Sequence, residues 1–264
     1  MVYRQLLAEP EAEAAFDALL QELQTAFTAG TRDPNEIVRD TLSQLFFGRN
    51  WAAAVDGARG TENSLTAQAL LHSLDPRNVT TEPEYYSDID AQRYAARKPY
   101  IWLWQMFDRS PMAQNALFGH RFRVLLAPFI FRSVGKNFKC WSFVEWSFGY
   151  NLSIGDNVVI HRHVLLDDRG GIEIGNNVSI SDYANIYSHS HDIDDIEKVS
   201  NRVTKISDHA RITYHATVLA GVSIGEHAMI GTGAVVTRHV APYHIALGIP
   251  AKTVKVKTAP IKAH

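Results

Sequence analysis

The sequence predicts a chain of two parts, an α-helical N-terminal region followed by a mainly β region built as a parallel solenoid. In the second part, aliphatic residues recur at every sixth position, in blocks of three. A small or β-branched residue stands four positions after each of them. An α-helix of about 3.6 residues per turn would bury no fixed position of a six-residue repeat, so the pattern favours short strands joined by tight turns.

The twelve aliphatic positions, here called the anchors, are all Ile, Leu or Val. They are Ile154, Ile160, Leu166, Ile174, Ile180, Ile186, Ile206, Ile212, Val218, Ile224, Ile230 and Val236. Three consecutive anchors would form one coil of a three-sided solenoid, and stacking of the coils would bury them. Gly155, Gly175, Gly225 and Gly231 directly follow anchors, where a crowded corner or a positive φ angle would exclude a Cβ atom.

The N-terminal part carries helix signals. Apolar residues at three-to-four spacing across residues 11–29 are followed by Gly30 as a stop. Asp33 and Pro34 have the order of an N-cap and a first helical residue, in a second helix that would end at Gly48. Two further helices are expected, one at about 64–73 and one within 88–107.

The composition indicates a folded globular chain, since 46% of the 264 residues are hydrophobic and 20% are charged. The net charge of -2 gives no overall field that would recruit nucleic acid or an anionic membrane. The single cysteine, Cys140, excludes an internal disulfide and is expected to be packed rather than nucleophilic. Without a recognisable signal or integral membrane segment, we expect a cytoplasmic protein.

The apolar stretch VLLAPFIF at residues 124–131 is flanked by arginines. We expect it to be buried in the protein, with contact to a membrane surface as the alternative. The change of pattern near this stretch sets the expected boundaries: a helical region at 1–130, the repeat domain at 131–257 and a tail at 258–264.

Three segments of the repeat resemble the hexapeptide-repeat acyltransferases. FKCWSFVEWSFGYNLSIGDN (138–157) is similar to the start of the β-helix in the maltose and galactoside O-acetyltransferases. IGNNVSISDYANIYSHSHD (174–192) resembles the same group and, more closely, the exopolysaccharide acetyltransferases of the colanic acid type. VVTRHVAPYHIALGIPAKTVK (235–255) resembles the family's closing segment.

This resemblance implies a left-handed parallel β-helix, here of about five coils, that transfers an acetyl group from acetyl-CoA directly to a hydroxyl. Acetyl-CoA would be a cosubstrate, with no permanently bound cofactor and no metal. The acceptor would be a sugar or a polysaccharide precursor. The family also implies a homotrimer whose active sites lie between neighbouring chains.

Two histidines, His189 and His191, stand in the stretch IYSHSHDID. Counting from the anchor Ile186 makes Ser190 the inward-facing residue, so both imidazoles would flank it and point outward. Fourteen residues (192–205) then interrupt the repeat, and an insertion of this kind leaves a solenoid as a loop. The count does not choose between the histidines. The resemblance, through Ser-His-Asp, selects His191 as the general base.

Other site residues follow from the resemblance. Those expected to bind the acceptor are His161, which stands in place of the family's asparagine, Asp168, His189 and Asp192. Those expected to bind acetyl-CoA are Arg211, Thr213, Thr232, Gly233, Thr237, Arg238 and Lys252. Arg238 and Lys252 would retain the positive charge that the nucleotide phosphates need.

Two other functions are compatible with such a repeat. The γ-class carbonic anhydrases share the fold and hold zinc with three histidines at a subunit interface, and this chain has twelve histidines. Alternatively, the β-helix is a scaffold without activity, because a fold does not define a function. Metal analysis and acetyl-CoA binding, respectively, distinguish these two from an acetyltransferase.

Overall fold

The computed structural model describes residues 7–60 and 64–258. The chain forms two compact units, one from Met1–Tyr85 and Asp90–Ile130, the other from Tyr86–Ile89 and Phe131–His264. The division after Ile130 coincides with the expected end of the helical region, but the four residues 86–89 belong to the second unit. Apart from residue 258, the expected tail lies outside the described residues.

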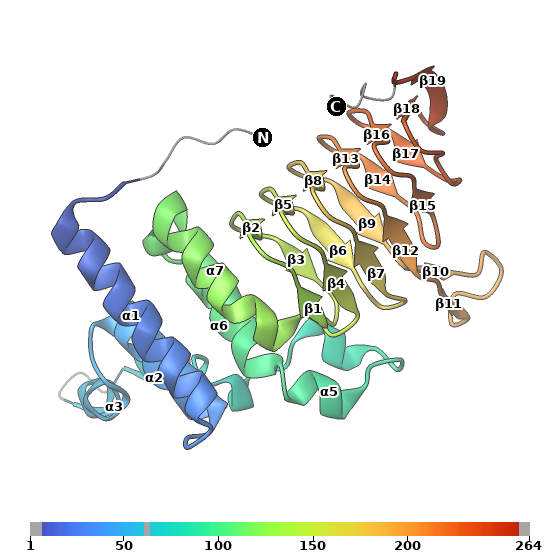
Figure 1. Ribbon diagram of the computed structural model, residues 1–264. Coiled ribbons are helices and arrows are strands. Elements are labelled where there is room, and N and C mark those ends of the chain that lie inside the picture. Colours follow the sequence, from blue (N-terminus) through green and yellow to red (C-terminus); the bar gives the residue numbers. More distant parts are fainter. Residues whose placement is uncertain (1–6, 61–63, 259–264) are drawn as a thin grey trace. The chain divides into compact units, whose positions relative to one another are not determined.

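The first unit is helical (Figure 1). Its α-helices are α1 (Pro10–Ala29), α2 (Pro34–Phe47), α3 (Trp51–Arg59), α4 (Leu65–His72), α5 (Ala91–Ala95), α6 (Lys98–Asp108) and α7 (Ala116–Ile130). Three short 3₁₀ helices join them: η1 (Pro76–Asn78), η2 (Glu82–Tyr85) and η3 (Pro111–Gln114). The stops at Gly30 and Gly48 are confirmed, because both glycines have a φ angle of 63°.

The sequence interpretation did not identify α3 or α7. Helix α7 contains Pro128, which is a helix-breaking signal, and it includes most of the stretch VLLAPFIF. Leu126, Ala127 and Ile130 of this stretch are fully buried, in agreement with the expected burial. Among the helices that the structure describes, none is both long and apolar enough to cross a membrane.

The second unit is a solenoid of three parallel sheets, called A, B and C. Sheet A contains β1 (Ser133–Val134), β4 (Leu152–Ile154), β7 (Ile172–Ile174), β12 (Thr204–Ile206) and β15 (Ser223–Ile224). Sheet B contains β2 (Lys139–Cys140), β5 (Val159–Ile160), β8 (Ser179–Ile180), β13 (Arg211–Ile212), β16 (Met229–Ile230), β18 (His244–Leu247) and the antiparallel edge strand β19 (Lys252–Val256). Sheet C contains β3 (Glu145–Trp146), β6 (Leu165–Asp167), β9 (Asn185–Tyr187), β14 (Thr217–Val218) and β17 (Val235–Val236).

Strand register stacks each anchor on the anchor of the next coil. Ile154 pairs with Ile174, which pairs with Ile206, and Ile206 pairs with Ile224. All twelve anchors are buried, with at most 4% of any one exposed. Cys140 is buried too, as expected. The hydrophobic interior of the solenoid is therefore the anchor column that the six-residue repeat predicts.

Several histidines of the repeat have a structural explanation at its corners. Most residues three positions after an anchor adopt positive φ angles, for example 57° at His163, 60° at Tyr183 and 56° at His215, whereas His189 does not. The Tyr183 ring stacks between these two imidazoles, with centroid distances of 4.8 and 4.9 Å. Such stacks join successive coils, so a histidine at this position is accounted for without chemistry.

The glycines that follow anchors are required by crowding rather than by a positive φ angle. A Cβ atom on Gly155 would lie 2.7 Å from the backbone of Gly175, and one on Gly225 would lie 2.4 Å from the nitrogen of Pro242. None of the four has a positive φ angle. Of the two reasons offered by the sequence, the crowded corner is the correct one.

Gly225→Ala is accordingly expected to destabilise the solenoid by about 1–3 kcal/mol, because the added methyl group overlaps backbone atoms that cannot rotate away. Gly233→Ala is the matched control, since Gly233 has a φ angle of 67° but nothing within 4 Å of the added atom. Chemical denaturation of both variants measures the difference. Because alanine at a φ angle of 67° is itself strained, Gly233→Ala measures a backbone cost without crowding, and a loss at Gly225 below about 1 kcal/mol would disprove the crowding argument.

Candidate functional site

The chain leaves sheet C as an antiparallel hairpin that carries both candidate histidines. Its strands are β10 (His189–His191) and β11 (Val199–Asn201), and they form a separate arm beside the stacked coils (Figure 1). Ser188, at the base of the arm, is fully buried. Its hydroxyl donates to the carbonyl oxygen of Asp167 at 2.5 Å and accepts from the Gly170 N–H at 2.8 Å.

The prediction that Ser190 faces inward is therefore wrong. Ser190 is exposed and pairs with Ser200 across the hairpin. The chain leaves the wall after Tyr187, earlier than the six-residue count assumed, because Ser188 anchors the turn away from the sheet. Both histidines lie on the arm, and the excursion begins before His191 rather than after it.

One ring nitrogen of His191 makes a hydrogen bond within the arm. Its Nδ1 lies 2.6 Å from the carbonyl oxygen of Ile196, further along the same arm. A carbonyl oxygen can only accept a hydrogen bond, so Nδ1 carries the proton in this contact. In a neutral imidazole, Nε2 is then the unprotonated nitrogen, and the exposed position of His191 leaves the ring within reach of a ligand.

His189 is held by a carboxylate instead. Its Nδ1 contacts Oδ2 of Asp167, whose side chain is buried and also accepts from the Ser147 hydroxyl at 2.9 Å. The rings of His189 and His191 meet edge to face with their centroids 5.4 Å apart. The arm thus presents two neighbouring imidazoles, each fixed through Nδ1.

Asp168, which was expected to bind the acceptor, faces the interior of the wall. It is fully buried, with Oδ1 accepting from the N–H of Phe148 at 2.6 Å and Oδ2 from that of Asn151 at 3.1 Å. Burial raises the pKa of Asp168 to about 6, against the opposing effect of these hydrogen bonds. We correct the expectation, because the preceding residue, Asp167, is the carboxylate that contacts a histidine of the arm, His189.

The remaining two predicted acceptor residues lie in different places. Asp192 belongs to the arm, where its Oδ1 accepts from the N–H groups of Asp194 and Asp195 at 3.0 and 3.3 Å. His161 follows β5 of sheet B, whereas the arm follows β9 of sheet C. It lies beside Asp182 at 3.8 Å, and burial lowers its pKa despite that carboxylate. Within a single chain, His161 therefore does not belong to the same site as the arm.

The predicted acetyl-CoA residues are spread over two sheets. Arg211 is exposed on β13 and Lys252 begins β19, both in sheet B, while Thr237 and Arg238 follow β17 of sheet C. Thr213 is buried, and its hydroxyl donates to the carbonyl oxygen of Ile230 at 2.7 Å. Thr232 and Gly233 stand in the turn of the next coil, with the Thr232 hydroxyl 3.4 Å from that of Thr213.

Positive charge gathers on the later strands of sheet B. Lys257 donates to the carbonyl oxygen of His227 at 2.6 Å. Burial, assisted by the charge of Arg211, lowers the pKa of Lys257, so these two cations are close enough to interact. With Lys252 on β19, this end of sheet B offers several cations to an anionic ligand.

One group of side chains has the composition of a metal site. Among the described residues, His209, Glu226 and His227 offer ligand atoms within 4.8 Å of one another. The two imidazoles are stacked, however, with centroids 4.4 Å apart and planes 4° from parallel. Because a coordinating lone pair lies in the plane of its ring, stacked rings direct their lone pairs side by side rather than towards one ion.

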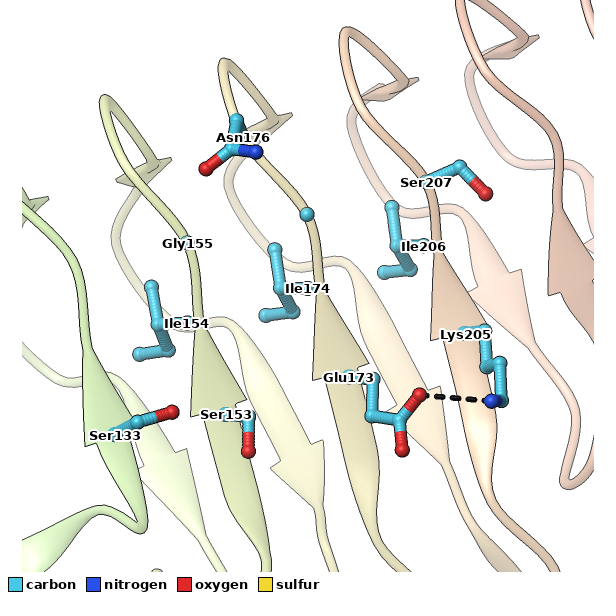
Figure 2. Close-up of a pocket in the computed structure, with 11 residues that line it drawn as sticks. Ser133, Ser153, Ile154, Gly155, Glu173, Ile174, Asn176, Lys205, Ile206 and Ser207 are labelled. Atoms are coloured by element: carbon cyan, nitrogen blue, oxygen red, sulfur yellow. Dashed lines mark ion pairs between the residues drawn. The ribbon is translucent and has the colours of Figure 1, made fainter.

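A shallow hollow of about 390 Å³ lies on the outer face of sheet A (Figure 2). Ser133, Ser153, Glu173 and Lys205 come from successive strands and line it, and the Glu173 carboxylate pairs with the Lys205 ammonium at 2.9 Å. None of its lining residues is a predicted site residue. The hollow is therefore separate from the arm that carries His189 and His191.

Comparison with known proteins gives a consistent result. No protein-family model matches the sequence. The galactoside O-acetyltransferase of Escherichia coli K12 is 28% identical over 131 residues, which are 48% of this chain and 64% of that protein. A probable acetyltransferase of Mycobacterium tuberculosis is 33% identical over 40% of this chain and 37% of its own length. The chain thus spans less than two thirds of these relatives.

Solved structures extend the likeness to the fold. A maltose O-acetyltransferase from Clostridium difficile 630 superposes with a TM-score of 0.57 at 26% identity, over 68% of this chain and 99% of that one. The chain is a relative of the hexapeptide-repeat acetyltransferases. A galactoside acetyltransferase in complex with coenzyme A has the same fold, with a TM-score of 0.56 at 22% identity, over 65% of this chain and 85% of that one.

The solenoid is a left-handed parallel β-helix, the fold of the hexapeptide-repeat acetyltransferases that it resembles, so the predicted fold class is confirmed. The predicted number of about five coils is slightly low. Five complete coils are followed by a partial sixth, in which Val240 bridges to Ile224 and β18 pairs with β16.

Proposed function

We propose that this chain is an acetyl-CoA-dependent O-acetyltransferase that acts on a hydroxyl of a sugar or polysaccharide precursor, with His191 as general base. The observation that carries the proposal is the contact between His191 Nδ1 and the Ile196 carbonyl oxygen, which leaves Nε2 as the proton-accepting nitrogen. The acetyltransferase relatives, two of which are named for sugar substrates, support the reaction class.

The reaction needs no covalent intermediate on the protein. His191 Nε2 takes the proton of the acceptor hydroxyl while the hydroxyl oxygen attacks the thioester carbonyl carbon of acetyl-CoA. A backbone N–H would stabilise the oxyanion of the tetrahedral intermediate. When that intermediate collapses, the carbon–sulfur bond breaks, the thiolate takes the proton from the imidazolium and the acetyl ester is released.

On the donor side, Arg211, Arg238 and Lys252 supply positive charge for the coenzyme A phosphates. A structure of a hexapeptide-repeat acetyltransferase from Vibrio cholerae complexed with acetyl-CoA supports this kind of donor. Thr213 is buried, so it contributes to the donor site by packing at its corner of the solenoid and does not present its hydroxyl to coenzyme A. Use of acetyl-CoA also agrees with the expected cytoplasmic location.

The proposal is tested by thiol release from acetyl-CoA in the presence of sugars, glycolipids and amines. We expect release that depends on a sugar hydroxyl. Release with amines alone would overturn O-acetylation. If calorimetry detects no binding of acetyl-CoA, the chain is instead a scaffold, and the donor residues have no such role.

We further propose that the active chain is a homotrimer. Most of the predicted donor residues are exposed on two sheets of one chain, and His161 lies away from the arm, so a neighbouring chain beside each flat face would complete the site. Light scattering at micromolar concentration should give a mass near three times 29.5 kDa. A monomer that still transfers acetyl groups would contradict this model of the site.

A further inference from the structure

Four residues that precede the β-helix by more than forty positions belong structurally to it. Asp88, in the segment Tyr86–Ile89, accepts from Arg169 through both oxygens: Nη2 lies 2.9 Å from Oδ1 and Nε 3.1 Å from Oδ2. Asp88 Oδ2 also accepts from the side-chain amide of Asn201 at 2.9 Å. The Arg169 guanidinium lies over the Tyr86 ring, 4.4 Å from its centroid.

Asp88 reaches the histidine arm by two routes. Asn201 is the residue of β11 that pairs with His189 across the hairpin. Arg169 is adjacent to Asp168, and its N–H points to Oδ1 of Asp167 at 3.4 Å, while Oδ2 of Asp167 contacts His189. Both the backbone partner of His189 and the carboxylate that holds its ring are therefore tied to the same aspartate.

The contact is well protected from water. The side chain of Arg169 is 6% exposed and that of Asp88 is 23% exposed, and the two form the planar, two-bond pairing that suits a guanidinium and a carboxylate. Burial opposes ionisation of Asp88, but the hydrogen bonds from Arg169 and Asn201 outweigh it and lower the pKa of this carboxyl. Asp88 is thus ionised near neutral pH.

The arm needs such a support because little else restrains it. Beyond Ser188, residues 190–198 are exposed or nearly so, and Ile193 is completely exposed. At the base, the Arg202 N–H donates to the Ser188 carbonyl oxygen at 2.8 Å, and the Thr204 hydroxyl donates to that of Tyr187 at 2.6 Å. These bonds fix where the arm leaves the wall, but none of them contacts an imidazole.

We propose that Tyr86–Ile89 is a strap on the catalytic arm, and that Asp88 and Arg169 are positioning residues that act through His189 on the strand bearing His191. The expected effect on the reaction rate rests on the proposed acetyl transfer, whereas the expected effect on the position of His189 does not. The proposal assigns a role in the reaction to a segment outside the repeat.

The test begins with Asp88→Asn. A neutral amide has one accepting oxygen and loses the charged pairing, so we expect kcat to fall about tenfold while KM for acetyl-CoA stays within twofold. Glu173→Gln is the matched control, because it removes an ion pair of similar length on the outer face of sheet A (Figure 2). That variant should retain full activity.

A double-mutant cycle separates positioning from a general structural effect. If Asp88 acts through His189, Asp88→Asn should cost much less in a His189→Gln background than in the wild type. Additive effects would overturn the proposal. Should Asp88→Asn fail to fold, Arg169→Lys replaces it in the cycle, since lysine keeps the charge but loses the two-bond geometry.

NMR of the histidine ring nitrogens gives a readout that does not depend on activity. In the wild type, the Nδ1 signal of His189 should show the hydrogen bond to Asp167, and Asp88→Asn should shift it while leaving His161 unchanged. An unchanged His189 signal would overturn the strap. If Asp88→Asn shifts the His189 signal but the wild type transfers no acetyl group, the proposed function fails and the strap stands.

Discussion

His191→Ala is expected to lower kcat by about 10²–10⁴-fold, the usual contribution of a positioned general base. The physical reason is the engaged Nδ1, which leaves Nε2 to take the acceptor proton. Alanine removes this nitrogen, and the Ile196 carbonyl oxygen returns to water. Thiol release from acetyl-CoA with the best acceptor measures the loss, and acetyl-CoA binding by calorimetry should stay within about threefold.

His189→Ala is the matched control for this prediction, since the two rings are neighbours on the same strand. We expect a loss of about tenfold, because His189 orients the site without taking the proton. A wild-type rate in His191→Ala would remove His191 as the base. If His189→Ala suffers the larger loss instead, the base is the imidazole held by Asp167.

Asp168→Ala is expected to destabilise the β-helix by about 2–4 kcal/mol. The substitution leaves the N–H groups of Phe148 and Asn151 buried without their acceptor, and each such group costs about 1–3 kcal/mol. Denaturant unfolding measures the loss. Asp156→Ala, at an exposed corner, is a suitable comparison, and an equal loss there would contradict a special role for the buried carboxylate.

Asp168 is also expected to make the free energy of unfolding depend on pH. Because burial raises the pKa of Asp168 to about 6, the native state holds this proton more tightly than the unfolded state between about pH 4 and 6. Its contribution to the free energy of unfolding therefore falls as the pH rises through this window. Relative to Asp168→Asn, which does not titrate, the wild type should lose about 2 kcal/mol between pH 4.5 and 7. A difference that is independent of pH would contradict the assignment.

Much of the fold could be predicted because its determinants are local and periodic. The twelve anchors are buried as the repeat requires, and the helix stops at Gly30 and Gly48 are where the sequence suggests. Helix α7 was not identified because Pro128 within it is ordinarily a stop signal and its surroundings override that preference. Tertiary packing, unlike a periodic pattern, cannot be counted along a chain.

The site was predicted less completely than the fold. The sequence selected the stretch containing His189 and His191, and it selected Asp168 of the preceding coil. It chose Asp168 where the structure uses Asp167, because a shift of one residue exchanges a side chain that faces the interior for one that faces the arm. Nothing in the sequence signalled Asp88, whose partners are 81 and 113 residues away.

Spacing and residue type were therefore sufficient for the parallel three-sided solenoid, since every coil repeats the same short-range requirement for an aliphatic anchor and a small neighbour. The point at which the chain leaves sheet C, the carboxylate that holds His189 and the strap at Asp88 were decided by contacts between distant segments. The buried hydroxyl of Ser188 determines where the chain leaves sheet C. A hydrogen bond of this kind depends on which coils stack together, and that becomes known when the whole solenoid is formed.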